Sequence, residues 1–276
     1  MCRWLAYSGS PIKLEELLLK RDHSLIDQSL HSRMGATTTN GDGFGVGWYG
    51  EDETPRVYRS THPAWNDRNL KELASGISSP LFFAHIRAST GSAIQETNTH
   101  PFRYGNWLWM HNGLIREFPK VHRELVNKID DSLFNSIEGT TDSETMFYLA
   151  LTFGLESDPV GAVEQMVGVV EETGQRHEIE HPLQMTIATT DGTSIWAFRY
   201  SSEGDSRSLW FSTRMDELKL LYPAIHELEN LSDETRVVVS EPLGDLPGVW
   251  NEAPESHYGI VQPGTDKLGP FMPRRP

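Results

Sequence analysis

Cysteine is almost absent from this chain, which has 276 residues and one cysteine, Cys2. A lone cysteine excludes an intramolecular disulfide. Positive charge is also scarce: 24 lysines and arginines stand against 39 aspartates and glutamates, and the net charge is −15. This balance argues against nucleic acid or an anionic membrane as the main partner. The chain shows no long apolar run and no charged-then-apolar leader, so the cytoplasm is the expected compartment.

The length allows one large domain or two small ones, and it is sufficient to bury a substantial core. Alternating or continuous apolar runs predict many short strands, and helical spacing predicts helices between groups of them. Strands grouped toward both ends of the chain, without strict βαβ alternation, indicate an α+β layered fold. The predicted strands are 2–7, 44–49, 56–60, 81–88, 107–111, 184–189, 194–200, 208–212, 236–240 and 258–262, and the predicted helices are 12–20, 66–75, 118–128, 142–153 and 159–174.

Cys2 directly follows the initiator methionine. Removal of Met1 would leave a cysteine with a free α-amino group, whose ordinary pKa is about 7.7–8.0. That amine can serve as the base for its own thiol, as in other N-terminal nucleophiles. The alternative is that Cys2 is a small buried hydrophobic residue.

A glycine-rich sequence, NGDGFGVGW, occupies residues 40–48. A nucleotide-binding loop would place its glycines between a strand and a helix, whereas these glycines precede a strand. We therefore expect a turn that enters a strand, with glycines that allow close approach of backbone.

Other polar residues stand beside predicted strands and helices. Arg87 follows an apolar run, and it could form either a buried structural ion pair or a fork for a carboxylate. Asn112 and Gly113 end another apolar strand, where the simplest interpretation is a turn. The same pair could instead supply a side-chain amide and a backbone N–H to an oxyanion.

The sequence TDSE at 141–144 predicts a capping box, with Thr141 as the N-cap and Glu144 as its reciprocal partner. Asp142 would then be an acid in the first helical turn, favoured there by the helix dipole. The histidine spacings match no metal-binding pattern, and Cys2 has no second thiol, so we expect no metal and no other cofactor.

Five motifs follow one another along the chain: Cys2, AHIR at 84–87, NTHPF at 98–102, HNG at 111–113 and TDSE at 141–144. Taken in order, these motifs resemble the class II glutamine amidotransferases of the N-terminal nucleophile hydrolase superfamily. The likeness is greatest to short stand-alone members, including the γ-glutamyl amidohydrolases of ergothioneine synthesis and glutathione breakdown, and it recurs at 240–243.

The resemblance implies a role for each matching residue. Cys2 would be the nucleophile, and Asn112 and Gly113 would form the oxyanion hole. Arg87 would bind the α-carboxylate of the substrate and Asp142 its α-ammonium. Residues Thr90 and His100 match positions that line the pocket. The family usually has a tryptophan beside the arginine, where this chain has Ala88.

The resemblance also implies a four-layer αββα sandwich in one domain, 1–276, with a catalytic core at 2–260 and a C-terminal tail at 261–276. The expected activity is attack on the γ-carboxamide of glutamine, giving a γ-glutamyl thioester and then glutamate and ammonia. A γ-glutamyl amide hydrolase with a larger leaving amine is an alternative, and a catalytically silent binding module is another. A separate synthase could accept the ammonia, and the oligomeric state is not implied.

Overall fold

Two antiparallel sheets form the centre of the molecule in the computed structural model, which describes residues 2–34, 39–89 and 91–274. The first sheet has seven strands, with β1 near its middle between β10 and β4. Its strands, in spatial order, are β11 (Trp250–Glu252), β9 (Trp210–Ser212), β10 (Arg236–Val239), β1 (Arg3–Lys13), β4 (Ser78–Ile86), β2 (Phe44–Trp48) and β3 (Arg56–Ser60).

The second sheet has six strands, and its long central pair is β6 with β7. The last segment of the chain, 261–276, contributes the edge strand β13 to this sheet. In spatial order the strands are β13 (Lys267–Pro270), β12 (His257–Val261), β8 (Ile195–Ser201), β7 (Leu183–Thr190), β6 (Trp107–Ile115) and β5 (Phe102–Tyr104).

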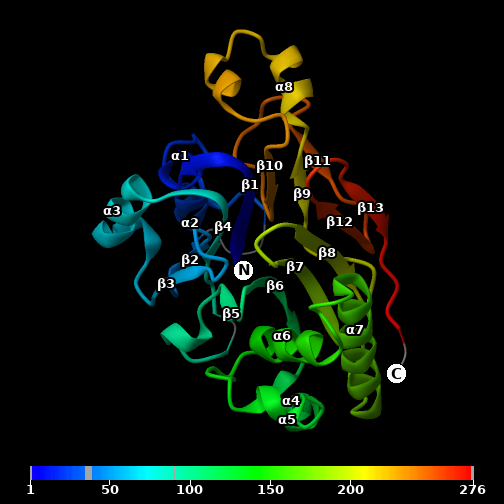
Figure 1. The fold of residues 1–276 in the computed structure, drawn as a ribbon. Helices are drawn as coiled ribbons and strands as arrows, with labels where there is room; N and C mark the ends of the chain where they lie inside the picture. The colour runs from blue at the N-terminus through cyan, green and yellow to red at the C-terminus, as the bar shows by residue number, and fades with distance from the viewer. Residues whose placement is uncertain (1, 35–38, 90, 275–276) are drawn as a thin grey trace.

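Helices cover the outer face of each sheet, as Figure 1 shows. The first sheet packs against α1 (Glu15–Leu18), α2 (Leu25–His31) and α3 (Arg68–Gly76), and the second against α4 (Phe118–Val126), α5 (Asp131–Phe134), α6 (Asp142–Thr152) and α7 (Pro159–Arg176). The helix α8 (Met215–Leu221) and the 3₁₀ turn η3 (His226–Asn230) extend from one end of the molecule (Figure 1). The expected αββα layering is confirmed.

A third apolar cluster lies between the two sheets and fixes their spacing. Trp4 from β1, Phe83 from β4 and Leu108 from β6 are fully buried in it. Each such side chain contributes about 1.5–3 kcal/mol when it is removed from water. The start of β1 lies near the centre of the molecule, in contact with β6 (Figure 1). The residue before β1, Cys2, is therefore held between the layers.

Most predicted elements are confirmed with small shifts of their ends, but the helix predicted at 12–20 is wrong. Residues up to Lys13 remain in β1, where Ile12 pairs with Ser79 after a register shift, and only Glu15–Leu18 is helical. The pairing with β4 outweighs the local helix signal, because tertiary contacts override propensity.

The predicted capping box is half correct. Thr141 caps α6, since its side chain accepts a hydrogen bond from Glu144 N at 3.1 Å. The Glu144 carboxylate does not return to Thr141; it accepts from Glu138 N at 3.0 Å and Gly139 N at 2.7 Å. It therefore fixes the loop that leads into the helix.

The glycine-rich sequence at 40–48 forms a turn followed by β2, as expected. A Cβ on Gly45 would meet the carbonyl oxygen of His100. Within the described ranges, no helix is long and apolar enough to cross a bilayer.

Candidate active site

The Cys2 thiol lies against the end of β4. Its Sγ accepts a hydrogen bond from Ala88 N at 3.5 Å, and it lies 3.6 Å from Ala88 O. Burial raises the pKa of this thiol, and the Ala88 N–H and the charge of Arg87 partly offset that effect, while Asp142 adds to it. A thiol with a raised pKa needs a base to become a nucleophile.

A buried ion pair holds the backbone behind Cys2. Arg3 donates from Nη1 to Cys2 O at 2.8 Å and from Nε to Glu241 at 2.7 Å. The same carboxylate meets His23 Nε2 at 2.6 Å and accepts from Arg33 N at 2.9 Å. Arg3, His23 and Glu241 are each about 2% exposed, so this group fixes the nucleophile through packing as well as charge.

Glu241 stands in the motif at 240–243, but the sequence does not reveal its ion pair with Arg3. The available signal was Arg3 itself, a charge in an otherwise apolar strand, because a buried charge requires a partner. The partner could not be named, since it lies 238 positions along the chain.

Asn112 and Gly113 lie within β6, opposite Thr186 and Met185 of β7. Asn112 is buried, and its backbone oxygen accepts from Thr186 Oγ1 at 3.4 Å. Its side-chain amide makes no hydrogen bond with another described residue. A Cβ on Gly113 would meet the carbonyl oxygen of Gln184, which explains why only glycine fits there.

Arg87 directly follows β4 and is 3% exposed. Its Nη2 donates to Ser92 Oγ at 2.8 Å and to Ala93 O at 3.0 Å. No carboxylate of the described residues lies within 4.0 Å of its guanidinium, so it does not form the structural ion pair that the sequence left open. Burial lowers the pKa of Arg87, and the nearby charges of Cys2 and Asp42 act in the opposite direction.

The turn at residue 42 fixes the segment that carries Arg87. Asp42 accepts from Ser89 N at 2.7 Å, and Arg87 N donates to Gly43 O at 2.8 Å. These contacts give the glycine-rich turn a supporting role that sequence analysis did not assign.

Asp142 is the first residue of α6 and is partly buried. Its Oδ2 accepts from Ile115 N at 2.8 Å, and its Oδ1 accepts from Ser143 N at 2.8 Å. Within the part of the chain that the structure describes, no basic side chain pairs with it. It is therefore a fixed carboxylate at the start of α6, and its charge raises the pKa of the Cys2 thiol.

Three buried histidines lie near these groups, and His111 faces α6 on the outer side of the second sheet. The ring centroids of His85 and His100 are 4.1 Å apart, and His100 also packs on Phe102. His111 Nδ1 shares a hydrogen bond with Ser143 Oγ at 2.8 Å. Burial lowers the pKa of His85 to about 3 and also lowers that of His100 and His111.

The residues expected to line the pocket are Thr90 and His100. His100 is 4% exposed, and neither ring nitrogen has a hydrogen-bond partner among the described residues. Thr90 lies outside the described residues. In ranges 2–34, 39–89 and 91–274, no group of three His, Cys, Asp or Glu side chains is arranged to hold a metal ion.

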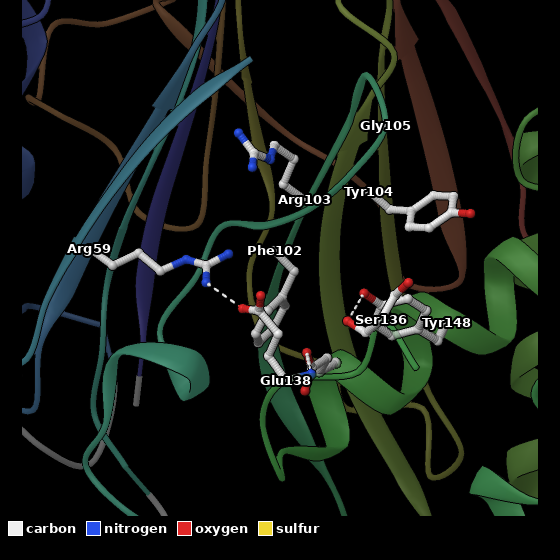
Figure 2. A pocket seen from close by; sticks show the side chains of 9 residues that line it. Arg59, Phe102, Arg103, Tyr104, Gly105, Ser136, Glu138 and Tyr148 are labelled. Atoms are coloured by element: carbon white, nitrogen blue, oxygen red, sulfur yellow. Dashed lines mark hydrogen bonds and ion pairs between the residues drawn. The ribbon is translucent and has the colours of Figure 1, made fainter. Parts of the chain in front are cut away.

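A separate cavity of about 280 Å³ opens beyond Phe102 (Figure 2). Arg59 and Glu138 face each other there at 3.7 Å, and the Tyr148 hydroxyl donates to Ser136 O. Its lining does not include Cys2 or Arg87, so it is distinct from the candidate site.

This chain is similar to known proteins over most of its length. A family model described as glutamine amidotransferases class-II matches residues 19–265. The probable glutamine amidotransferase DUG3 of Saccharomyces cerevisiae is 34% identical, with 99% of this chain and 85% of the relative aligned. The gamma-glutamyl-hercynylcysteine sulfoxide hydrolase of Mycolicibacterium smegmatis is 28% identical, over 95% of this chain and 96% of its own.

Two solved structures are similar to this chain over nearly its whole length. A glutamine aminotransferase class-II domain protein from Silicibacter pomeroyi has a TM-score of 0.74 and 29% identity, covering 99% of this chain and 100% of that chain. The glutamine phosphoribosylpyrophosphate amidotransferase from B. subtilis has a TM-score of 0.63 at 13% identity, covering 99% of this chain and 50% of that one. At this identity the second likeness concerns the fold alone.

Proposed function

Because this chain belongs to the class II glutamine amidotransferases, we propose that Cys2 is the nucleophile that hydrolyses the γ-carboxamide of glutamine and of larger γ-glutamyl amides. The chain is an enzyme with the N-terminal nucleophile hydrolase fold, and its relatives are glutamine amidotransferases and a γ-glutamyl hydrolase. We treat 1–276 as one catalytic domain, with a core at 2–260 and a tail at 261–276.

The chemistry begins with proton transfer from the Cys2 thiol to its own α-amine, which is free once Met1 is removed. The thiolate forms a bond to the carbonyl carbon of the γ-carboxamide, and the carbonyl π electrons move to oxygen. The Asn112 amide and the Gly113 N–H stabilise this oxyanion. Collapse expels the amine, which takes the proton from the α-ammonium, and leaves a γ-glutamyl thioester on Cys2.

Water then attacks the thioester with the α-amine again acting as base. Glutamate is released, and the thiol and free amine are restored. Every atom and proton is accounted for by substrate, water and Cys2, so these steps need no further reactant.

One observation carries this proposal: the opposite charges of Arg87 and Asp142 both act on the Cys2 thiol, and neither side chain has an ion-pair partner among the described residues. Arg87 matches an α-carboxylate, and Asp142 matches an α-ammonium. A buried charge that lacks its partner is costly, so the pair should favour a free amino-acid end and reject substrates without it. N-acetylglutamine and asparagine are therefore expected to be poor substrates.

The name of one relative supports a leaving amine larger than ammonia. The M. smegmatis protein is named for hydrolysis of a γ-glutamyl substrate much larger than glutamine. It aligns over nearly the whole of this chain, so we propose that the leaving side of the site admits more than ammonia. Transfer of ammonia to a separate synthase is the second candidate, supported by the amidotransferase name of the yeast relative.

The test is to incubate the purified protein with glutamine and a panel of γ-glutamyl amides, without ATP or added metal, and to follow glutamate release. Turnover of glutamine and of at least one larger amide is expected, and Cys2→Ala should abolish both. Restriction to free glutamine would favour a subunit that supplies ammonia to a partner. Absence of all turnover from folded protein that lacks Met1 would favour a silent binding module.

A further inference from the structure

Arg207 is an arginine without an ion pair, in a position that the proposed reaction does not use. It lies between β8 and β9 and is partly buried. Of the arginines in the described ranges that are at least partly buried, only Arg87 and Arg207 have no carboxylate within 4.0 Å. The paired ones are Arg3, Arg59, Arg116, Arg199, Arg214 and Arg236.

The segment 205–208 crosses from the second sheet to the first near the start of β1. At one end, Gln184 Nε2 donates to Asp205 O at 2.6 Å, and Gln184 is the residue whose backbone packs on Gly113. At the other end, Ser208 Oγ donates to Ser240 O at 2.8 Å. Ser240 is in turn bonded to Trp4, two residues beyond Cys2. Arg207 is thus anchored between the proposed oxyanion hole and the start of β1.

The strand order places Arg207 on the opposite flank of the nucleophile from Arg87. β1 has β4 on one side, and Arg87 directly follows β4. On the other side β1 has β10 and then β9, and Arg207 stands just before β9. A substrate with its glutamyl end at Arg87 and its scissile carbonyl at Cys2 reaches Arg207 if its leaving amine extends toward this second flank.

The guanidinium of Arg207 has little to offset its charge. Its Nε is enclosed and has no hydrogen-bond partner among the described residues. Burial lowers the pKa of Arg207, the nearby charge of Arg3 lowers it further, and Asp205 acts in the opposite direction. Since Glu241 is already bound to Arg3, the ion pair behind Cys2 supplies no spare anion.

We propose that Arg207 binds a carboxylate on the leaving amine, so that the preferred substrates are γ-glutamyl amides of amino acids or peptides rather than glutamine. This inference rests on the proposed function. A guanidinium presents two parallel N–H donors that match the two oxygens of a carboxylate. A substrate of this class would meet an arginine at each end, with the scissile amide between them at Cys2.

The experiment compares γ-glutamylglycine with γ-glutamylglycinamide, which differ only in the carboxylate of the leaving group. For the wild-type protein, kcat/KM should favour the carboxylate by at least about tenfold, the scale of one hydrogen bond to a charged group. In Arg207→Gln this ratio should fall to about one, and Arg207→Lys should keep part of it. Arg68→Gln removes an exposed, unpaired arginine at the start of α3 and should leave the ratio unchanged.

The outcomes separate this inference from the proposed function. If glutamine and both dipeptides are hydrolysed but the wild-type ratio is near one, or if the ratio persists in Arg207→Gln, the role of Arg207 is wrong while the proposed function stands. If neither glutamine nor either dipeptide is hydrolysed by folded protein that lacks Met1, both fail. Because a ratio of two substrates is used, partial loss of active protein does not affect the result, and Arg207→Lys supplies the test if Arg207→Gln does not fold.

Discussion

Replacement of Asp142 by asparagine separates a role in substrate binding from a role in the helix. The two carboxylate oxygens accept from Ile115 N and Ser143 N, so the variant turns an amide NH₂ toward one of these donors. An unsatisfied backbone donor costs about 1–3 kcal/mol, and a loss of folding free energy in this range is expected. A first-turn acid that served only the helix dipole would account for about 0.3–1 kcal/mol.

The catalytic effect should be larger and should depend on the substrate. A hydrogen bond between charged groups contributes about 1.5–3 kcal/mol, which corresponds to a loss of roughly one to two powers of ten in kcat/KM. Glutamine should suffer this loss in Asp142→Asn. The analogue in which hydrogen replaces the α-ammonium should not, because it has no charge for Asp142 to bind.

The assay is therefore a two-by-two comparison of wild type and Asp142→Asn with glutamine and its desamino analogue, together with unfolding in denaturant. Asp216→Asn is the matched control, since Asp216 is also in the first turn of a helix but lies in α8. An equal loss of kcat/KM for both substrates would show that Asp142 acts through structure alone and would refute its role as an ammonium ligand.

Three further predictions address the oxyanion hole, the ion pair behind Cys2 and the buried histidines. Asn112→Ala should lower kcat by roughly 10²–10³, as for one oxyanion donor, and a change confined to KM would contradict that role. Glu241→Gln should reduce the free energy of unfolding by about 3 kcal/mol, because it leaves Arg3 buried without its partner; a loss below about 1 kcal/mol would show that the pair is not needed. The pKa of His85 in the folded protein, about 3, lies below its unfolded value of about 6.5, so its neutral form contributes full stability above pH 6.5 and loses it as the pH falls toward 3. This loss amounts to about 2 kcal/mol at pH 5, so between pH 7 and pH 5 the free energy of unfolding of His85→Asn should fall by about 2 kcal/mol less than that of the wild type; an unchanged pH dependence would contradict this.

Much of the fold could be predicted because its elements carry local signals. The strand β3 has the bounds predicted from its sequence, and α6 begins after the predicted cap Thr141. The helix predicted at 12–20 was wrong because Ile12 and Lys13 pair with a strand more than 60 positions away, and no local pattern reveals that pairing. Glu144 likewise satisfies backbone donors of a preceding loop, whose shape the sequence does not indicate.

The site could be predicted in part for the same reason. Cys2, Arg87 and Asn112 stand in short motifs whose order points to one family. Arg207 stands in no such motif, and its importance follows from which strands are neighbours of β1 and from the absence of a carboxylate beside it in the described residues. Contacts between distant segments of the chain decide which strands are neighbours of β1 and which groups lie beside Arg207. These features therefore become visible only in three dimensions.

The central claim is that Cys2, freed of Met1, is the nucleophile. Its most direct test is intact-protein and peptide mass spectrometry after reaction with a glutamine analogue that carries an electrophile at the γ-position. One adduct per chain is expected, located on Cys2 in protein that has lost one methionine, and its formation should parallel the loss of glutamate release. A homogeneous, active preparation that retains Met1, or inactivation by an adduct on any other residue, would contradict the account.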